Sequence, residues 1–328
     1  MKSSVVGNFP KVGDSHEQQK LRRGIEAYQQ QKILKADLQE IQDAVTQQAI
    51  QEQINAGIDL ITDGQIRWDD PLVWPARKFK GISVNGLLRF FDNNVYYRQP
   101  VVESAVGWIE PVLVHDFQFA LRSVPKTASL KVVLPGPYTL GRLSKNQHYS
   151  KIEDLVLDFA RALAKEAKAL EGAGAKFLQF DEPSLPLYPE DFKLAAKAIE
   201  ICTTPLAHST IYVYTYFSSL SKTFDDLQNL PIHGLGVDLV SSAENIQLLR
   251  DKRSAKDLAL GLVDARNTKM ENEEDLRNLL ESFEKNLDRI QFLNPSCGLE
   301  FLPYNSAVKK LNLIAGLTKD LVSSTKKG

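Results

Sequence analysis

The sequence has little cysteine, little methionine and no long hydrophobic run. Of its 328 residues, 2 are cysteines and 2 are methionines, and the cysteines are Cys202 and Cys297. Two thiols do not make a disulfide framework, so we expect a chain of the cytoplasm. We see no apolar run of the signal-peptide type and no stretch of transmembrane length. These absences exclude disulfide scaffolds and membrane-embedded proteins.

An excess of charge of either sign is also absent. The net charge is −1, with 25% charged and 43% hydrophobic residues. A near-neutral chain gives no basis for a nucleic-acid or membrane-surface partner, and we expect neither. No linker rich in Pro, Gly or Ser divides the chain, so we predict one domain over residues 1–328. We expect the small, polar and basic residues 323–328 to fray.

Two neighbouring carboxylates follow a short apolar segment, Lys176–Phe180. The segment is typical of a strand covered on both faces, and Pro183 ends it because proline cannot extend a ladder. Asp181 and Glu182 then lie at the carboxyl end of the strand. In a barrel this end carries the active face, so both are candidate catalytic residues. The alternative is two charges on an ordinary surface loop.

Short apolar segments alternate with longer amphipathic ones along most of the chain. The predicted strands are Ser3–Phe9, Ile58–Thr62, Leu130–Leu134, Lys176–Phe180, Thr210–Tyr216, Leu235–Val240, Leu258–Val263 and Ile290–Leu293. The predicted helices are 18–48, broken near 32–36 and ending at Gly57, and then 152–171, 189–202, 224–230, 243–251, 271–287 and 306–322. Eight strand–helix units imply an α/β fold, a closed (β/α)8 TIM barrel.

Residues 85–125 interrupt this alternation. Leu88–Phe91 and Val95–Tyr97 flank the turn-forming cluster Asp92–Asn94, which predicts an inserted β-hairpin. Residues 68–74 are aromatic and irregular, and we expect a loop there. The hairpin is therefore an excursion from the barrel and not a second domain.

Polar residues recur where the predicted strands end. In a barrel they gather at one mouth, which is how this fold builds a binding site. They are Asn8, Asp63, Asp181, Tyr216, Asp238, Asp264, Asn294 and Cys297. Position predicts a site here and does not name its ligand.

Several strand-end motifs together resemble the cobalamin-independent methionine synthases. The segments are Val5–Pro10, Ala56–Gly64, Leu134–Thr139, Gln179–Pro183 and Asn294–Leu299. The resemblance spans nearly the whole chain. It implies methionine biosynthesis, in which one of two related barrels holds homocysteine as a zinc thiolate for methylation. Homocysteine and a folate polyglutamate are the small molecules that the resemblance implies.

The sequence departs from the zinc-bearing barrel of that family. Tyr212-Val213-Tyr214 stands where the family has a His-x-Cys pair, and a phenol is a poor zinc ligand. Asp238 is the nearest carboxylate to the expected glutamate ligand, and Cys297 is the one matched metal position. No histidine follows the candidate catalytic residue Asp264. We therefore expect no cofactor on this chain, with zinc as the alternative that the resemblance implies.

The N-terminal, metal-free barrel of the large synthases fits better. The matching segments include Phe90–Tyr97, Gly234–Val240 and Leu260–Asn267. In that barrel basic residues near the start help to bind the folate tail. Here Lys11, Lys20, Arg22 and Arg23 occupy that region. Basic side chains suit a carboxylate tail because charge-assisted hydrogen bonds are strong. Solvated charges on a helix are the alternative.

The leading hypothesis is a barrel that works with a separate zinc-bearing methionine synthase barrel. Asn8, Lys11, Lys20, Arg22, Asp63, Tyr216, Asp238 and Asn294 would bind substrate. The aromatic residues Trp68, Trp74, Tyr96 and Tyr97 would lie at the interface, with core packing as their alternative. A single barrel that transfers methyl groups alone, or a non-catalytic ligand-binding protein, remain open hypotheses.

Overall fold

The first helices follow from a proline-free segment rich in Gln, Lys, Glu and Leu. The computed structural model describes residues 1–325. Of residues 323–328, which we expected to fray, 323–325 continue the last helix and 326–328 lie outside the described residues. Helix α1 (Lys20–Gln29) and helix α2 (Lys35–Ala56) are separated by a short turn, as predicted. Gly57 ends α2 with φ of 86°, a left-handed conformation that glycine adopts without steric cost. The predicted break and C-cap are confirmed.

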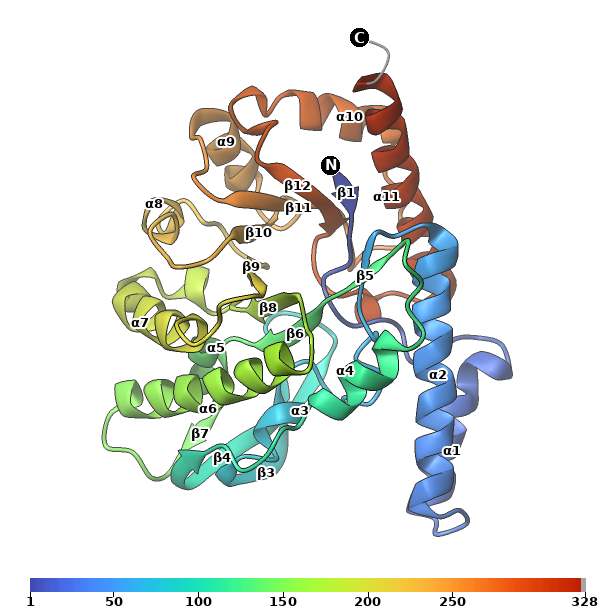
Figure 1. Ribbon diagram of the computed structural model, residues 1–328, viewed down its shortest axis with the longest axis vertical. Helices are drawn as coiled ribbons and strands as arrows, with labels where there is room; N and C mark the ends of the chain where they lie inside the picture. The colour runs from blue at the N-terminus through green and yellow to red at the C-terminus, as the bar shows by residue number, and fades with distance from the viewer. Residues whose placement is uncertain (326–328) are drawn as a thin grey trace.

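The strands form a closed parallel barrel. They are β1 (Lys2–Ser3), β2 (Leu60–Ile61), β5 (Ser129–Leu130), β6 (Val132–Pro135), β8 (Phe177–Asp181), β9 (Thr210–Thr215), β10 (Gly234–Asp238), β11 (Asp257–Val263) and β12 (Ile290–Pro295). The main sheet runs β1-β12-β11-β10-β9-β8-β6, and β2 pairs with β5. A parallel bridge between Ser4 and Leu60 joins β1 to β2 and closes the ring. With β5 and β6 taken as one interrupted strand, the predicted (β/α)8 fold is confirmed (Figure 1).

The first two strands are shorter than the predicted Ser3–Phe9 and Ile58–Thr62. Gln53 of α2 takes the place of a neighbouring strand, because its amide bonds both the N–H and the C=O of Thr62 at 3.0 Å. The Thr62 hydroxyl then donates to the carbonyl of Gly7 at 2.6 Å. Side chains therefore hold the backbone where a ladder was expected.

The helices cover the outside of the barrel. They are α5 (Pro137–Leu143), α6 (Ile152–Gly172), α7 (Phe192–Thr203), α8 (Phe224–Leu227), α9 (Ala243–Asp251), α10 (Glu273–Glu281) and α11 (Tyr304–Thr325). Helices α11 and α2 lie side by side (Figure 1). The predicted helix 271–287 ends early at Glu281. Asn286 binds the carbonyls of Leu249 and Lys252 with its side chain, which draws the following turn toward α9.

The inserted hairpin is confirmed and is longer than predicted. Strand β3 (Lys80–Arg89) pairs antiparallel with β4 (Tyr96–Gly107), and β7 (Lys145–Asn146) extends the sheet. Asp92–Asn94 makes the turn, with Phe90 N–H donating to the carbonyl of Val95 at 2.8 Å. Helix α3 (Val73–Ala76) replaces part of the expected loop, and α4 (Val114–Leu121) follows the hairpin.

Two of the aromatic residues predicted for an interface belong to the core instead. Trp68 is 4% exposed and Tyr97 is 2% exposed, and both belong to the buried hydrophobic core. Tyr96, on the other face of β4, is 52% exposed. Alternation along a strand separates the two tyrosines, and it makes core packing the correct interpretation for Tyr97.

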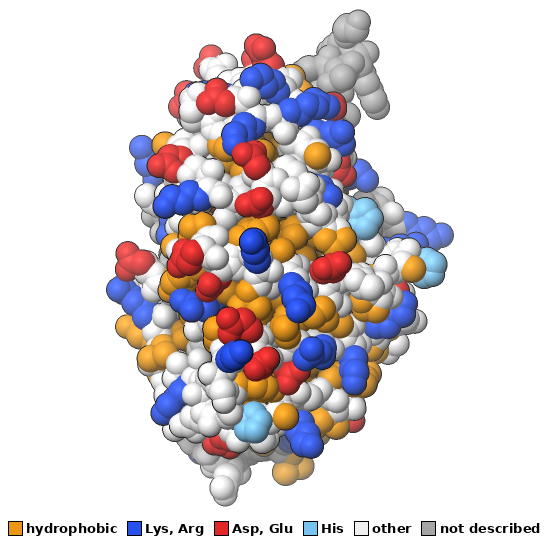
Figure 2. All heavy atoms as spheres, turned by 90° about the vertical axis from the view of Figure 1, so that its left-hand side faces the viewer, with side chains coloured by type: hydrophobic (Ala, Val, Ile, Leu, Met, Phe, Trp, Pro, Cys, Tyr) orange, Lys and Arg blue, Asp and Glu red, His pale blue; other side chains and the backbone are white. Residues whose placement is uncertain are grey.

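The surface and the helices agree with the composition. Figure 2 shows Lys and Arg side chains interspersed with Asp and Glu on the face drawn, without a field of one sign. No helix within the described part of the chain is both long and apolar enough to cross a membrane.

Candidate functional site

The barrel interior is layered, and its layers differ in chemistry. Near the amino ends of the strands, the rings of Phe177, Tyr212 and Phe292 pack with centroids 5.0 to 5.8 Å apart. One step toward the carboxyl ends, the inward side chains become polar. Lys131 donates to Gln179 Oε1 at 2.6 Å, and its ammonium lies 4.7 Å from the centre of the Tyr214 ring. Interior layers of such barrels are usually branched and apolar, so this polar layer is a functional signal.

Asp181 lies above this layer, at the mouth. Its Oδ1 accepts from Gln179 Nε2 at 2.6 Å, and its Oδ2 accepts from the Tyr216 hydroxyl at 3.2 Å. Burial raises the pKa of Asp181 to about 7, although the bond from Gln179, the charge of Lys131 and the bond from Tyr216 oppose the rise. A carboxyl group that titrates near neutral pH in a concave site is a candidate for ligand binding or proton transfer.

Glu182 is the next residue and has a different environment. It is fully buried and accepts from the N–H groups of Tyr138 and Thr139 at 2.9 and 2.8 Å. These are the first turn of α5, so Glu182 caps that helix. Gly136 makes room for the carboxylate, since a Cβ atom there would lie 2.1 Å from Glu182 Cδ. Burial raises the pKa of Glu182 to about 7 against these bonds.

The other predicted residues of the first strands also lie near the mouth. Asn8 is 7% exposed and donates to Glu300 Oε1 at 2.6 Å. Lys11 donates to the carbonyl of Trp68 at 2.6 Å and lies 3.7 Å from Glu300 Oε2. Asp63 accepts from the N–H of Gln65 at 2.9 Å, and burial raises its pKa to about 6. Lys11 is therefore engaged inside the protein and is not a free basic group.

An aromatic cover closes the mouth. Asp181, Tyr216 and Asn8 share a cavity of about 10 Å³ with Phe90 of the hairpin tip and with Phe301. This is about the room that one water molecule needs. A small-molecule ligand would therefore enter only if the cover moved.

The cover consists of Phe90, Phe91, Phe217 and Phe301, whose rings contact one another. One arginine also contacts it. The Phe91 and Phe217 ring centroids lie 5.6 Å apart, and both residues have positive φ, 52° and 73°. The Arg266 guanidinium lies 5.2 Å from the Phe217 ring centre. Positive φ is uncommon for such bulky residues, and strained backbone is concentrated at functional sites.

The side chains of Asp238 and Asn294 form hydrogen bonds within the barrel. The Asp238 carboxylate accepts from the N–H groups of Phe217, Val240 and Ser241 at 2.9 to 3.0 Å. Asn294 is fully buried and donates to the Tyr214 hydroxyl at 3.3 Å. Asp238 therefore shapes the loop that carries Phe217.

The residues around Cys297 do not fit a zinc ion. Among the described residues, no group of three or more His, Cys, Asp or Glu side chains is arranged to hold a metal. Burial, and next the charge of Asp238, raise the pKa of the Cys297 thiol well above its ordinary value. A structural zinc ion needs four ligands and a catalytic one three, and the described residues do not supply such a set around Cys297.

Tyrosine rings occupy the place of the expected His-x-Cys pair. Cβ atoms built on Gly234 and Gly236 of β10 would lie 2.2 and 2.3 Å from the rings of Tyr212 and Tyr214, respectively. The rings thus lie flat against a glycine backbone on the next strand. Neither tyrosine is a ligand donor of the zinc type, and the carboxylate of this strand pair, Asp238, accepts from backbone N–H groups.

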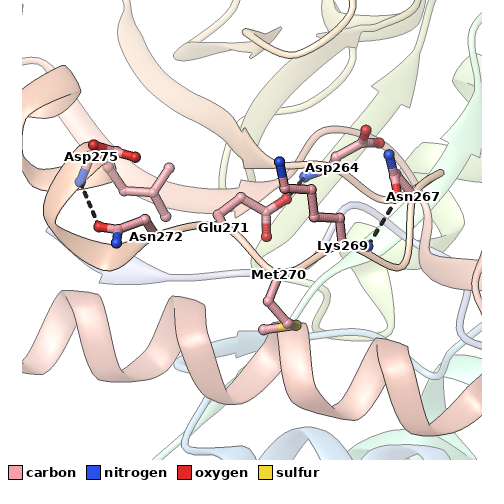
Figure 3. A pocket seen from close by; sticks show the side chains of 8 residues that line it. Asp264, Asn267, Lys269, Met270, Glu271, Asn272 and Asp275 are labelled. Carbon is pink, nitrogen blue, oxygen red and sulfur yellow. Dashed lines mark hydrogen bonds between the residues drawn. The ribbon is translucent and has the colours of Figure 1, made fainter.

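Asp264 does not line the cavity of Asp181. It lines a hollow of about 370 Å³ together with Glu271 and Lys269 (Figure 3). Glu271 accepts from the N–H of Asp264, and Asn267 accepts from the N–H of Lys269, at 2.8 and 2.9 Å. These bonds within one loop hold the loop's shape. Asp264 also lines a second hollow of about 440 Å³ beside the hairpin tip, with Asn93 and Arg266.

The basic residues of α1 lie away from the mouth. Arg22 pairs with Glu26 at 2.9 Å and Lys20 lies 3.6 Å from Glu17, both on the surface. Arg23 donates to the carbonyl of His16 at 2.7 Å. Helix α1 packs on α2 outside the barrel (Figure 1). The structure therefore does not bring Lys20 and Arg22 together with Asp181.

Sequence reasoning overlooked two residues of the site, Lys131 and Gln179. Each stands within a strand whose neighbours are apolar, at an inward-facing position. A polar side chain within a buried strand is the signal that would have found them, because buried polar groups need partners.

The fold and this polar mouth define a (β/α)8 barrel with a candidate binding site at the carboxyl ends of its strands. A family model described as the catalytic domain of cobalamin-independent synthase matches residues 1–320. The methionine synthase of Saccharolobus solfataricus is 32% identical over 321 residues, covering 94% of this chain and 91% of that protein. That of Sulfurisphaera tokodaii is 32% identical over 325 residues, covering 96% and 90%.

The chain belongs to the cobalamin-independent methionine synthase family, a family of methionine biosynthesis, as its motifs indicated. A solved B12-independent methionine synthase from Shewanella, in complex with selenomethionine, has a TM-score of 0.82 at 22% identity. The alignment covers 98% of this chain and 99% of that one, and shows a shared fold. The matched family model is that of the catalytic domain, whereas the missing ligands led us to expect the N-terminal type.

Proposed function

We propose that this chain takes part in methyl transfer to homocysteine as a metal-free barrel. It would work with a separate zinc-bearing barrel of the same family, which activates the thiol. The observation that carries the proposal is the packing of Tyr212 and Tyr214 against glycines where the ligand pair would stand. A chain of this family without a zinc donor set needs another source of thiolate activation.

The mouth would bind the amino-acid part of the substrate or product. Asp181 is suited to an ammonium group because it is a partly buried carboxylate with its own oxygens already oriented. Asn8 and Tyr216 border the same cavity, and the cover of Phe90 and Phe301 would move to admit the ligand. Glu182 supports the site by fixing α5.

The methyl donor is 5-methyltetrahydrofolate or another methyl carrier. The exposed groups Lys20 and Arg22 on α1 would meet an anionic polyglutamate tail outside the barrel. Because α1 lies away from the mouth, their contribution would be to affinity and not to chemistry.

The zinc content of the purified protein tests the proposal, with Cys297→Ser alongside. We expect no stoichiometric zinc in either protein, and methionine formation only after a zinc-bearing synthase barrel is added. About one zinc per chain, lost in the variant, would overturn the proposal. Turnover by this chain alone would also overturn it.

One observation favours a second candidate, a methyltransferase that acts alone. The matched family model is that of the catalytic domain, and it spans residues 1–320. This candidate predicts turnover by the isolated chain, without an added barrel. A non-catalytic ligand-binding protein predicts binding in the mouth and no turnover with any partner.

A further inference from the structure

A fully buried lysine lies in the middle of the barrel. The Lys131 side chain comes from the residue between β5 and β6 and is 1% exposed. Its ammonium donates to Gln179 Oε1 at 2.6 Å and faces the Tyr214 ring at 4.7 Å. Burying a charged group is costly unless a specific partner compensates, so Lys131 requires an explanation beyond packing.

Lys131 fixes the orientation of the Gln179 amide. An ammonium group has only donors, so it holds the amide oxygen toward itself and turns the NH2 group away. The NH2 group donates to the carbonyl of Val6 at 2.7 Å and to Asp181 Oδ1 at 2.6 Å. With the amide reversed, two donors would face each other and Asp181 would lose its bond. The orientation of Gln179, and with it that of Asp181, therefore depends on Lys131.

We propose that Lys131 is a positioning residue of the mouth, which acts through Gln179 to hold the Asp181 carboxylate in one orientation and in its ionised form. The chain of contacts is continuous from the interior to the mouth: ammonium, amide, carboxylate. The ligand-binding consequence rests on the proposed function, because an ammonium ligand binds Asp181 only when that carboxylate is ionised. The electrostatic link between Lys131 and Asp181 does not depend on the proposed function.

The ionisation of both groups falls in the same range. Burial lowers the pKa of Lys131 to about 7, against the charge of Asp181, and burial raises the pKa of Asp181 to about 7. Each charge therefore supports the other, and loss of one makes the other less favourable. The further groups facing the pair are Tyr214, Tyr216, Glu182, and the carboxylates Asp63 and Asp116, which share a cavity of about 20 Å³ with Lys131.

The first test compares two buried lysines. Lys131→Met keeps the length of the side chain and removes the charge. Lys310→Met does the same to a lysine that is 0% exposed and pairs with Glu271 at 2.8 Å, outside the mouth. The readout is an NMR pH titration of protein labelled at aspartate Cγ, with the Asp181 signal assigned through Asp181→Asn. We expect the midpoint of Asp181 to rise by about one to three pH units in Lys131→Met and to stay in place in Lys310→Met.

A midpoint that does not move in Lys131→Met would overturn the proposal, and so would an equal shift in both variants. The reciprocal experiment covers the case in which Lys131→Met does not fold. In Asp181→Asn, with lysine labelled at Cε, the midpoint of Lys131 should fall, because the coupling acts equally on both groups. An unchanged Lys131 midpoint would contradict the proposal.

Binding of L-methionine, measured by calorimetry across pH, separates this inference from the proposed function. We expect the pH at which binding is half-lost to rise in Lys131→Met and to be unchanged in Lys310→Met. If the unmodified protein binds no methionine at any pH, the proposed ligand is wrong. The NMR shift of Asp181 would then still support the role of Lys131, and its absence would still overturn it.

Discussion

Carboxylates at the two ends of the barrel have opposite properties. At the amino end, Glu171 at the end of α6 accepts from the N–H groups of Ala207, His208 and Ser209 at 2.7 to 3.0 Å. Burial alone would raise its pKa, but the bonds from Lys168 and these N–H groups lower the pKa to about 2. At the carboxyl end, burial raises the pKa of Asp181 to about 7. Both groups are carboxylates, and the difference in pKa comes from their different hydrogen-bond partners.

The comparison shows that the carboxylate at the amino end stabilises the fold, whereas the carboxylate at the mouth does not when it is ionised. Glu171 is most favourable when charged, and it fixes the loop that enters β9. Asp181 has two side-chain partners and lies beside a cavity, and burial still outweighs these bonds and the charge of Lys131, so its charge is only partly compensated. Such local conflict is expected at functional sites and is offset elsewhere in the fold.

The largest expected effect is at the amino end. Glu171→Ala leaves three backbone N–H groups without their acceptor, and we expect the free energy of unfolding to fall by about 3 kcal/mol. Glu190→Ala, at an exposed glutamate, should change it by less than about 0.5 kcal/mol. Urea denaturation measures both. Equal losses in the two variants would mean that the N–H bonds of Glu171 contribute nothing.

The next effect concerns the close approach that Glu182 needs. Gly136→Ala places a methyl group 2.1 Å from Glu182 Cδ, so we expect a loss of about 2 kcal/mol from overpacking. The control is Gly172→Ala at the end of α6, where no described atom lies within 4 Å of the added methyl. The control should be neutral or slightly stabilising in thermal melts. If Gly136→Ala were equally harmless, Glu182 would not hold α5 in the way described.

A smaller effect appears in the dependence of stability on pH. The pKa of Asp181 is higher in the folded chain than the 3.8 of an ordinary aspartate, so the folded state holds the proton more tightly. Stability from this group is present below pH 3.8 and is lost as the pH rises to about 7. Asp181→Asn cannot ionise, so its stability relative to the unmodified chain should rise across this range. Denaturation at both ends of this pH range measures the difference in unfolding free energy between the variant and the unmodified chain. A difference that does not change with pH would contradict the prediction.

Glu171 should show the opposite sign in the same experiment. Its pKa is lowered, so its stabilisation is fully present above the ordinary value of 4.5 and is lost as the pH falls toward about 2. Removing Glu171 should therefore matter less in acid than at neutral pH. A loss that does not depend on pH would break the contrast between the two ends.

The smallest effect is expected from Tyr216→Phe. The hydroxyl bonds Asp181 at 3.2 Å, and its removal should cost about 0.5 kcal/mol. The Asp181 midpoint should rise by less than it does in Lys131→Met, because a weak neutral bond is lost and not a charge. NMR titration ranks the two variants, and the reverse order would mean that Tyr216, not Lys131, sets the charge of Asp181.

Much of the fold could be predicted from the alternation of apolar and amphipathic segments and from the Gly and Pro residues that end them, because both signals are local in the sequence. Helix α9 has the predicted bounds, 243–251, and Gly57 ends α2 as expected. The first two strands were predicted too long because Gln53 supplies hydrogen bonds across the chain, which no local pattern contains. Long-range side-chain bonds of this kind are visible only once the fold is known.

The site was predictable in position and less so in detail. Strand ends gave Asp181, Asn8 and Tyr216, which do share one cavity. The different environments of Asp181 and Glu182 could not be predicted, because they depend on a helix and a glycine that lie more than forty residues away. Lys131 was overlooked because it lies within the predicted strand Leu130–Leu134 and not at a strand end.

The tyrosines packed on Gly234 and Gly236 make a pair of metal ligands hard to introduce at these positions. A smaller residue at position 214 would leave a void beside the glycine, and a larger residue at position 236 would collide with the ring that is 2.3 Å from its Cβ. Neither single step is favourable while its partner is unchanged. The four positions are therefore coupled, and a ligand pair could be introduced here only through simultaneous changes on two strands.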